Sequence, residues 1–272
     1  LRFFASSGQE LAYEIADWNT SGTSDIWVKV PSISGTSTVI TAAWGKTGTE
    51  NTPDYSSNDP VWSNDFGGAW HFSTTSTNFP DSSPNGHHAT RNSVGVTNSG
   101  MVGKGASFTG TEFADVSYSD LLNTDKFTVS IWAKRASGTG HAAPYSARGN
   151  NDGTRGYILY SQNNTFQFWT GKAAVGSWDM TPVSSTHSLN TWYHIASTYD
   201  GTTKKIWLNG VGGATSNANP NYAKNTLYGL RIGSGANEDP TGQFFWVGEL
   251  DEMRHSSINR SADWIKAEYD NH

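Results

Sequence analysis

The sequence predicts an all-β fold with antiparallel strands and one short helix near its C-terminal end. Hydrophobic residues make up 35% of the 272 residues and charged residues only 15%, so the polar fraction is mostly Gly, Ser, Thr and Asn. That composition is typical of short strands joined by many turns. Apolar residues alternate with polar ones in most regular runs, and a helical period occurs only near the end of the chain.

The first part of the chain contains three alternating runs. The expected strands are 11–15, 26–30 and 38–44. The stretch 46–60 that follows has no periodicity and is rich in Thr, Asn, Ser, Pro and Asp, which is typical of a linker. We therefore expect a smaller β domain over residues 1–62 and a larger one over residues 63–272.

The second part of the chain continues with strands separated by glycines. The expected strands are 70–72, 127–133, 192–199, 204–208, 227–232 and 244–253. Asn209-Gly210 is a strong turn signal after the fourth of these. Ser261 can cap a helix over 262–269, with Asp263 in its first turn. The larger domain is therefore antiparallel β with one terminal helix.

Charge and composition exclude several classes of partner and chemistry. The formal net charge is −6 and no stretch is rich in Lys or Arg, so we expect no nucleic-acid partner. The chain contains no run of about eighteen apolar residues, so we expect no insertion in a membrane. The lack of cysteine excludes thiol catalysis and Cys-based zinc sites. Because the chain opens at Leu1 without a signal peptide, we expect part of a larger multidomain chain.

Seven motifs follow one another along the larger part of the chain. They are Asp81–Gly86, Gly103–Phe108, Phe127–Trp132, Trp192–Ala196, Tyr199–Gly201, Leu208–Gly210 and Gly248–Arg254. In this order and spacing they resemble the bacterial LamG-like jelly-roll family of the concanavalin A-like lectins and glucanases, over roughly Phe66–His272. The resemblance implies a concanavalin A-like antiparallel β-sandwich, or jelly roll, in a secreted or cell-surface protein.

The N-terminal stretch carries a different set of motifs. They are Leu1–Phe3, Leu11–Ile15, Ile26–Pro31 and Trp44–Gly45. These are similar to the second half of a bacterial domain of unknown function that often precedes LamG modules in surface and ExbB-associated proteins. The usual first strands of that domain are absent, so the resemblance implies a partial β domain. It implies no chemistry.

The resemblance also places a structural calcium ion (Ca²⁺) between Asp81 and Asp251. Carbonyl groups of Asn85 and His88 are implied as further ligands. Calcium takes about six to eight oxygen ligands, and a Gly-terminated turn rich in Asp and Asn supplies both carboxylate and carbonyl oxygens. The local sequence alone favours a simple turn, with Asp251 paired to Arg254, and it is the resemblance that favours calcium.

The strand near residue 250 bears on catalysis, because glucanases of the same fold carry Glu-x-Asp-x-Glu on one strand. Period two places those three carboxylates on one face, and retaining cleavage needs two carboxyl groups about 5–5.5 Å apart. Glu249 and Asp251 fit the first two places, but Met253 occupies the third. We expect Glu252 to point to the opposite face. The pattern is therefore incomplete, and we expect no enzyme activity.

The most binding-like segment is 141–178, which is rich in Gly, aromatic and planar polar side chains. Sugar rings are held by aromatic faces, with amides, carboxylates and guanidinium groups reaching the hydroxyls. In LamG-like relatives ligands meet the concave sheet or its rim, where this segment falls by resemblance. Trp246 and the loop 237–239 form a second candidate edge. The candidate residues of the segment are His141, Tyr145, Arg148, Asn151, Asp152, Arg155, Tyr160, Gln167, Trp169 and Trp178.

Three hypotheses for function follow. The first is a non-catalytic carbohydrate-binding, lectin-like module that binds a polysaccharide or glycan. The second is a structural or adhesive protein-interaction module, in which the segment is an ordinary hairpin with core tryptophans. The third, a glycoside hydrolase or lyase, is disfavoured by Met253. One fold hosts several functions, so the side chains of the site must decide.

Overall fold

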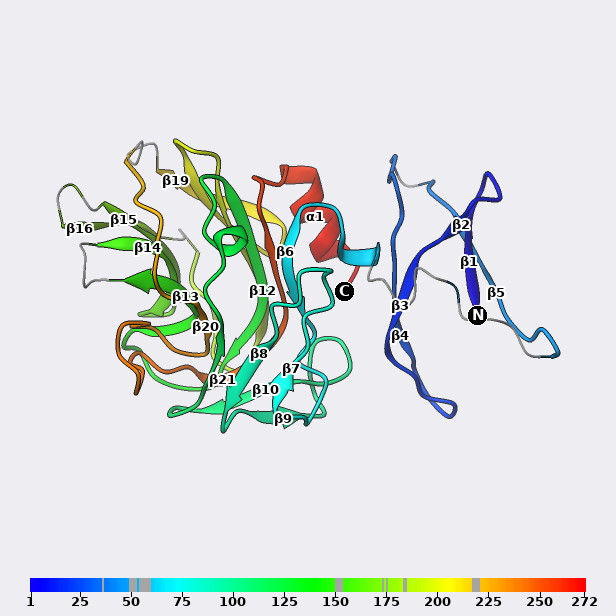
Figure 1. Cartoon of the computed structure of the whole chain (residues 1–272), viewed down its shortest axis with the longest axis horizontal. Helices are drawn as coiled ribbons and strands as arrows, with labels where there is room; N and C mark the ends of the chain where they lie inside the picture. The colour runs from blue at the N-terminus through cyan, green and yellow to red at the C-terminus, as the bar shows by residue number, and fades with distance from the viewer. Residues whose placement is uncertain are drawn as a thin grey trace.

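The computed structural model describes residues 1–35, 37–48, 53, 60–149, 154–172, 174, 176–182, 185–216 and 221–272. It contains a small N-terminal β unit beside a large two-sheet sandwich (Figure 1). This arrangement confirms the predicted all-β fold, with one α-helix among the described residues. Within the described residues, no helix has the length and apolar character needed to span a membrane.

The first sheet of the sandwich, sheet I, has eight strands in the described chain, in the order β19-β18-β17-β12-β21-β10-β9, with β6 paired to β21. Every pairing is antiparallel. The strands are β6 (Phe66–Trp70), β9 (Gly95–Thr97), β10 (Gly105–Thr109), β12 (Phe127–Arg135), β17 (Trp192–Tyr199), β18 (Lys204–Leu208), β19 (Val211–Ser216) and β21 (Val247–Ser256).

The second sheet, sheet II, also has eight strands in the described chain, in the order β16-β15-β14-β13-β20-β11-β8-β7. It too is antiparallel throughout. The strands are β7 (Asn78–Phe79), β8 (Ala89–Asn92), β11 (Phe113–Val116), β13 (Ala142–Gly149), β14 (Arg155–Gln162), β15 (Thr165–Lys172), β16 (Ser177–Pro182) and β20 (Leu230–Ile232).

The core lies between the two sheets. Successive side chains of a strand point to opposite faces, so every second residue of the central strands enters one apolar cluster. On β12 these are Phe127, Val129, Ile131 and Ala133, all fully buried. Alternating residues of sheet II meet them, and the cluster includes Tyr145, Tyr157, Leu159, Phe166, Phe168, Leu230 and Ile232.

The N-terminal unit consists of two small sheets, β2-β1-β5 and β3-β4, around a cluster of Phe3, Leu11 and Tyr13. In Figure 1, β3 and β4 are the strands nearest to the sandwich. Trp27 of β4 packs there against Trp62. The strands are β1 (Arg2–Ala5), β2 (Glu10–Leu11), β3 (Tyr13–Asp17), β4 (Asp25–Val28) and β5 (Ile40–Ala43). Most of the predicted linker 46–60 lies outside the described residues.

The helix α1 (Ala262–Asp270) covers part of the outer side of sheet I. Ser261 caps it as predicted, because its side chain accepts a hydrogen bond of 3.1 Å from the backbone N–H of Trp264. Ile265 is fully buried against Ala196 and Trp207. The described residues also contain two short 3₁₀ turns, η2 (Pro60–Trp62) and η3 (Asp120–Leu122).

Candidate functional site

The outer side of sheet II, which we call the open face, carries an unusual set of side chains. On β14, Tyr157 and Leu159 enter the core, so strand alternation turns Ile158 and Tyr160 outward. The same alternation turns Trp169 outward from β15. Opposing residues form one unbroken row across seven strands of this face: Met180, Trp169, Ile158, Ser146, Arg231, Asp115 and Thr90.

A loop between β20 and β21, residues 233–246, crosses the middle of this row. The Ser146 hydroxyl donates to Asn237 Oδ1 at 2.6 Å, and Asn237 Nδ2 donates to the Ser146 carbonyl at 2.9 Å. Asn237 Nδ2 also donates to the carbonyl of Gly229 at 2.8 Å. These bonds fix the loop on the sheet. It divides the open face into an aromatic half on β14–β16 and a polar half on β8, β11 and β20.

The aromatic half contains five rings, which we call the aromatic cluster: His141, Tyr160, Trp169, Trp178 and Phe244. Ring centroids of Tyr160 and Trp169 are 5.0 Å apart, and those of Trp169 and Trp178 are 6.5 Å apart. Tyr160 is buried, whereas the two tryptophans are only partly covered. Partly covered indole rings are suited to stack against a flat, weakly polar ligand surface.

A chain of polar groups borders the cluster. The indole N–H of Trp169 donates to Gln167 Oε1 at 3.0 Å, and Gln167 Nε2 donates to Gln162 Oε1 at 3.4 Å. Gln162 Nε2 lies 3.3 Å from His141 Nδ1. Burial, together with the charge of Arg135, lowers the pKa of His141, so its ring is neutral near pH 7. His141 Nε2 is buried and has no hydrogen-bond partner among the described residues.

Arg148 supports the cluster from below. Its guanidinium pairs with both carboxylate oxygens of Glu238, with a 3.2 Å contact from Nε. It also donates to the Tyr160 hydroxyl at 3.3 Å and lies 5.4 Å from the Trp178 ring. The Arg148 side chain is 9% exposed, and Glu238 neutralises its charge inside the protein. Arg148 therefore orients Tyr160 and Trp178.

The polar half contains a pocket of about 240 Å³. Arg231 and Asp115 form its floor through two hydrogen bonds of 2.8 and 3.1 Å. The other lining residues are Thr90, Val116, Ser117, Gly229 and Asn237. This pocket was not predicted, because its residues come from separate strands that only the sheet topology brings together.

The structure gathers six of the eleven predicted ligand residues on the open face. They are His141, Arg148, Tyr160, Gln167, Trp169 and Trp178. Arg155 begins β14 and is partly exposed. Asn151 and Asp152 lie outside the described residues.

The predictions for Tyr145 and Trp246 are wrong. Both side chains are completely buried in the core between the sheets, where no ligand reaches them. A register shift between Ala142 and Tyr145 reverses the face that simple alternation from His141 predicts for β13. Trp246 follows Phe244, whose positive φ of 54° bends the chain back toward the core.

The predicted calcium residues lie in a different arrangement. Asp81 Oδ1 accepts from the backbone N–H groups of Ala69 and Ser83, at 2.9 and 2.8 Å. Its Oδ2 accepts from the Ser83 hydroxyl and the N–H of His87, both at 2.8 Å. A carboxylate has about four lone-pair sites, so protein donors use all of them. The Asp81 carboxylate therefore stabilises the loop to which it belongs.

The other predicted ligands also make contacts of their own. His88 Nδ1 accepts from the N–H of Asp81 at 3.0 Å, and Asn85 Nδ2 donates to the carbonyl of Phe66 at 2.8 Å. Buried Asp251 accepts from the N–H groups of Val102 and Glu252, both at 2.9 Å. The described residues contain no group of three His, Asp or Glu side chains placed to hold a metal ion. A calcium ion between Asp81 and Asp251 would have to displace these donors from the Asp81 carboxylate, and the ion stays a prediction.

A β-bulge changes the predicted faces of β21. Ser130 opposes Arg254 while Trp132 opposes Asp251, so Glu252 and Met253 together face one residue of β12. Glu252 has a φ of 48° and shares the outer side with Asp251, which corrects the prediction that the two point apart. Met253 lies in the core. The third carboxylate place of the glucanase pattern is therefore filled by a core residue.

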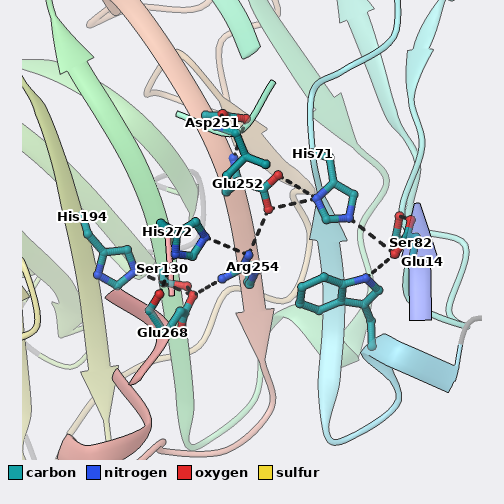
Figure 2. Close-up of polar contacts among 12 residues, drawn as sticks. Glu14, His71, Ser82, Ser130, His194, Asp251, Glu252, Arg254, Glu268 and His272 are labelled. Atoms are coloured by element: carbon teal, nitrogen blue, oxygen red, sulfur yellow. Dashed lines mark hydrogen bonds and ion pairs between the residues drawn. The ribbon is translucent and has the colours of Figure 1, made fainter. Parts of the chain in front are cut away.

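Glu252 belongs to a network that the sequence did not indicate. His71, which follows β6, lies 2.8 and 2.9 Å from the two Glu252 oxygens and 3.6 Å from Glu14 of the N-terminal unit. Arg254 contacts Glu252 at 2.9 Å and Glu268 of α1 at 2.8 Å. Figure 2 shows these five residues, the joint network, connecting β3, β6, β21 and α1.

Four members of the joint network are buried, and Glu14 at its edge is 30% exposed. Burial lowers the pKa of His71, but the charges of Glu252 and Glu14 outweigh it and raise the pKa to about 10. Burial likewise opposes the ionised form of Glu268, while Arg254 and the His194 contact hold its pKa far below the usual range. The adjoining cavity, lined in part by His71 and Glu252, holds only about 30 Å³. That is room for little more than water, so we assign the network to fastening the two units together.

Comparisons with known proteins address the fold. The family model of the concanavalin A-like lectin/glucanases superfamily matches residues 108–266, more than half of the 272 residues. A domain of unknown function, DUF2341, matches residues 1–73. Both matches agree with the predicted resemblances. The comparison with curated proteins finds no significant match.

Similar solved structures share the sandwich at low sequence identity. One is domain 4 of the extracellular arabinanase AbnA from Geobacillus stearothermophilus, in complex with arabinotriose (16% identity, TM-score 0.61, covering 74% of this chain and 97% of that one). Another is the carbohydrate-binding module CBM40 of a Ruminococcus gnavus sialidase, bound to α2,3 sialyllactose (15% identity, TM-score 0.54, covering 61% of this chain and 95% of that one). A third is the binding domain of Paraclostridial Mosquitocidal Protein 1 (14% identity, TM-score 0.62, covering 76% of this chain and 52% of that one). This chain therefore spans about half of that domain.

Proposed function

Because the chain belongs to the concanavalin A-like lectin/glucanases superfamily, we propose that it is a non-catalytic carbohydrate-binding module of a larger bacterial protein. Its ligand lies against the aromatic cluster of the open face. The observation that carries this proposal is the partial exposure of Trp169 and Trp178 on neighbouring strands, beside the amides of Gln162 and Gln167.

The chemistry of this surface suits a sugar. Aromatic faces accept the apolar C–H side of a pyranose or furanose ring, and planar amides and imidazole nitrogens bond its hydroxyls. Two of the similar structures hold a neutral and an acidic oligosaccharide respectively, arabinotriose and sialyllactose, which supports a glycan as the class of ligand.

The carboxylates near this surface support a binding role over hydrolysis. Asp115 and Glu238, on the described part of the open face, each accept two hydrogen bonds from an arginine. A retaining or inverting glycosidase needs one carboxyl group free to protonate the leaving oxygen. Glu249, on sheet I, pairs with Lys134. We therefore propose that bound glycan is released unchanged.

The test is the Trp178→Ala variant in affinity electrophoresis with neutral and acidic polysaccharides. We expect its affinity for the retained polysaccharide to fall about tenfold, since a central aromatic contact is worth about 1–2 kcal/mol of binding. Trp18→Ala is the matched control, because Trp18 is a 56% exposed tryptophan of the N-terminal unit. If wild type and both variants migrate alike in every gel, the proposed function is wrong.

A protein-binding role is the second candidate, and one observation favours it. Trp44, Val39 and Trp18 of the N-terminal unit are 78%, 64% and 56% exposed. Exposed apolar side chains of this size are frequent at protein interfaces. This role predicts self-association or partner binding that Trp44→Ala removes and Trp178→Ala leaves intact, which light scattering after size exclusion measures.

Calcium binding and an extracellular location are further parts of the proposal, supported by the resemblance to LamG-like modules. Calcium at Asp81 requires that its loop give up the protein donors described above. Thermal unfolding with calcium and with a chelator tests this. A shared unfolding midpoint in the two conditions contradicts the calcium part alone.

A further inference from the structure

We propose that the pocket between Arg231, Asp115 and Thr90 binds one unit of a neutral sugar, and that this face rejects acidic sugars. This inference rests on the proposed function and specifies its class of ligand. It is drawn from the polar half of the open face, which lies across the loop from the aromatic cluster.

The size and place of the pocket favour a single ring. Its volume of about 240 Å³ is below the roughly 300–1,000 Å³ of sites that enclose drug-sized ligands. Its floor lies in the same row of opposing residues as Trp169 and Met180 of the aromatic half. A glycan on this face therefore meets stacking surface in one half and a polar recess in the other.

Arg231 forms the floor of the pocket but is not available as an anion site. Its Nε and Nη2 atoms donate to both oxygens of Asp115, at 2.8 and 3.1 Å. Its Nη1 donates to the carbonyl of Asp239 at 2.8 Å. The Phe113 ring covers the guanidinium at 4.2 Å. The Arg231 side chain is only 5% exposed, and Asp115 neutralises its charge. The N–H donors of its guanidinium are already bonded to protein oxygens.

Asp115, in contrast, presents an accepting surface to the pocket. Its side chain is 46% exposed, so its carboxylate meets solvent on the side away from Arg231. Each carboxylate oxygen has a further lone pair beyond the one used by Arg231. The hydroxyl groups of Thr90 and Ser117 also line the pocket. This is a set of acceptors and hydroxyls, which suits the hydroxyl groups of a neutral sugar.

An acidic sugar meets repulsion at the same place. Its carboxylate would lie near that of Asp115, with the adjacent guanidinium already paired, and like charges brought together lower affinity. The aromatic half repeats this arrangement, because Glu238 neutralises Arg148. Arg148 and Arg231 are thus both compensated by protein carboxylates, in a chain of net charge −6. The face has no free cation at either ion pair to attract a uronate or a sialic acid.

The test compares Asp115→Asn with wild type in affinity electrophoresis. The neutral gels contain arabinan, galactan, mannan or β-glucan, and the acidic gels contain polygalacturonate, alginate or hyaluronate. Wild type is expected to be retarded by a neutral polymer and not by an acidic one. Asp115→Asn keeps the shape of the side chain but frees the charge of Arg231, so it is expected to lose at least about fivefold in affinity for the neutral polymer and to gain retardation by an acidic one.

Asp125→Asn is the matched control, because it makes the same change in net charge at an 82% exposed side chain before β12. Thermal unfolding of each variant verifies its fold. If Asp115→Asn migrates like Asp125→Asn while Trp178→Ala loses retention, the pocket inference is wrong and the proposed function stands. Equal retardation of wild type by acidic polymers also overturns the inference. If no polymer retards wild type, both proposals fall.

Discussion

The outer side of sheet I and the open face of sheet II both combine tryptophan, histidine, arginine and glutamate side chains. On sheet I, the joint network is covered by the N-terminal unit and α1, and Trp27 and Trp62 close over Arg254 at 4.6 and 4.8 Å. On sheet II, the loop 233–246 covers only the middle, and Trp169 and Trp178 remain partly exposed. The two regions have the same types of residue, and they differ in whether other parts of the chain cover them. The covered region joins the two units, and the uncovered region is available for binding.

The electrostatics of the two regions differ for the same reason. In the joint network, charges contributed by four separate elements neutralise one another in a largely buried region, because an unpaired buried charge is very costly. On the open face, each arginine is paired locally and its carboxylate keeps contact with solvent or with the edge of the face. Changes to the joint network should therefore alter stability, and changes to the open face should alter binding.

The largest effect is expected from Arg254→Met. Removing this guanidinium leaves Glu252 and Glu268 buried without their shared cation, and breaking a buried pair costs about 3–5 kcal/mol. The unfolding midpoint should fall by roughly 10 °C, as calorimetry would measure. Lys266→Met is the control, because it breaks an exposed pair with Asp270 and should change the midpoint by little. Equal midpoints for the two variants would contradict the role of the joint network.

An intermediate effect is expected from the pH dependence of His71. Its pKa is about 10 in the folded chain and about 6.5 when unfolded. The folded state therefore holds the proton more tightly, and this stabilisation is complete below pH 6.5 and is lost as the pH rises through 10. The midpoint of wild type should fall relative to that of His71→Asn over this range. Lys204, whose pKa burial lowers to about 8, is common to both proteins and cancels in the comparison.

The control for this pH series is His141→Asn on the open face. Burial lowers the pKa of His141, so it carries no proton to lose above pH 6.5. Its pH profile in that range should parallel the wild-type profile. A parallel profile for His71→Asn as well would show that the His71 charge does not stabilise the joint network.

Sequence reasoning predicted several of the strands and the aromatic segment, and two of its errors have one physical origin. Alternation is a reliable guide to the face of a side chain only while the register is unbroken. The register shift before Tyr145 and the bulge at Glu252 each interrupt the alternation of side chains between the two faces of the strand. Composition does not reveal either interruption. Both residues were therefore placed on the wrong side of their strands.

The residues that were missed altogether share a second origin. Asp115 and Arg231 are 116 positions apart in the sequence, and His71 and Glu252 are 181 apart. Only the order of strands in each sheet makes them neighbours. No local pattern distinguishes such a pair from isolated surface charges. The segment 141–178, by contrast, was found because three consecutive strands of one sheet carry most of the aromatic half.

The smallest effect is expected from Tyr160→Phe, which separates the support of the aromatic cluster from its contact surface. The Tyr160 hydroxyl accepts one hydrogen bond from Arg148, and the residue is 2% exposed. Loss of that bond should cost about 0.5–1.5 kcal/mol of stability and leave polysaccharide retention within about twofold of wild type. Tyr118→Phe, which removes an exposed hydroxyl bonded to Asp120, is the control for losing a hydroxyl as such. If Tyr160→Phe abolishes retention as Trp178→Ala does, the hydroxyl itself reaches the ligand, and the binding surface extends below the tryptophans to the floor of the sheet.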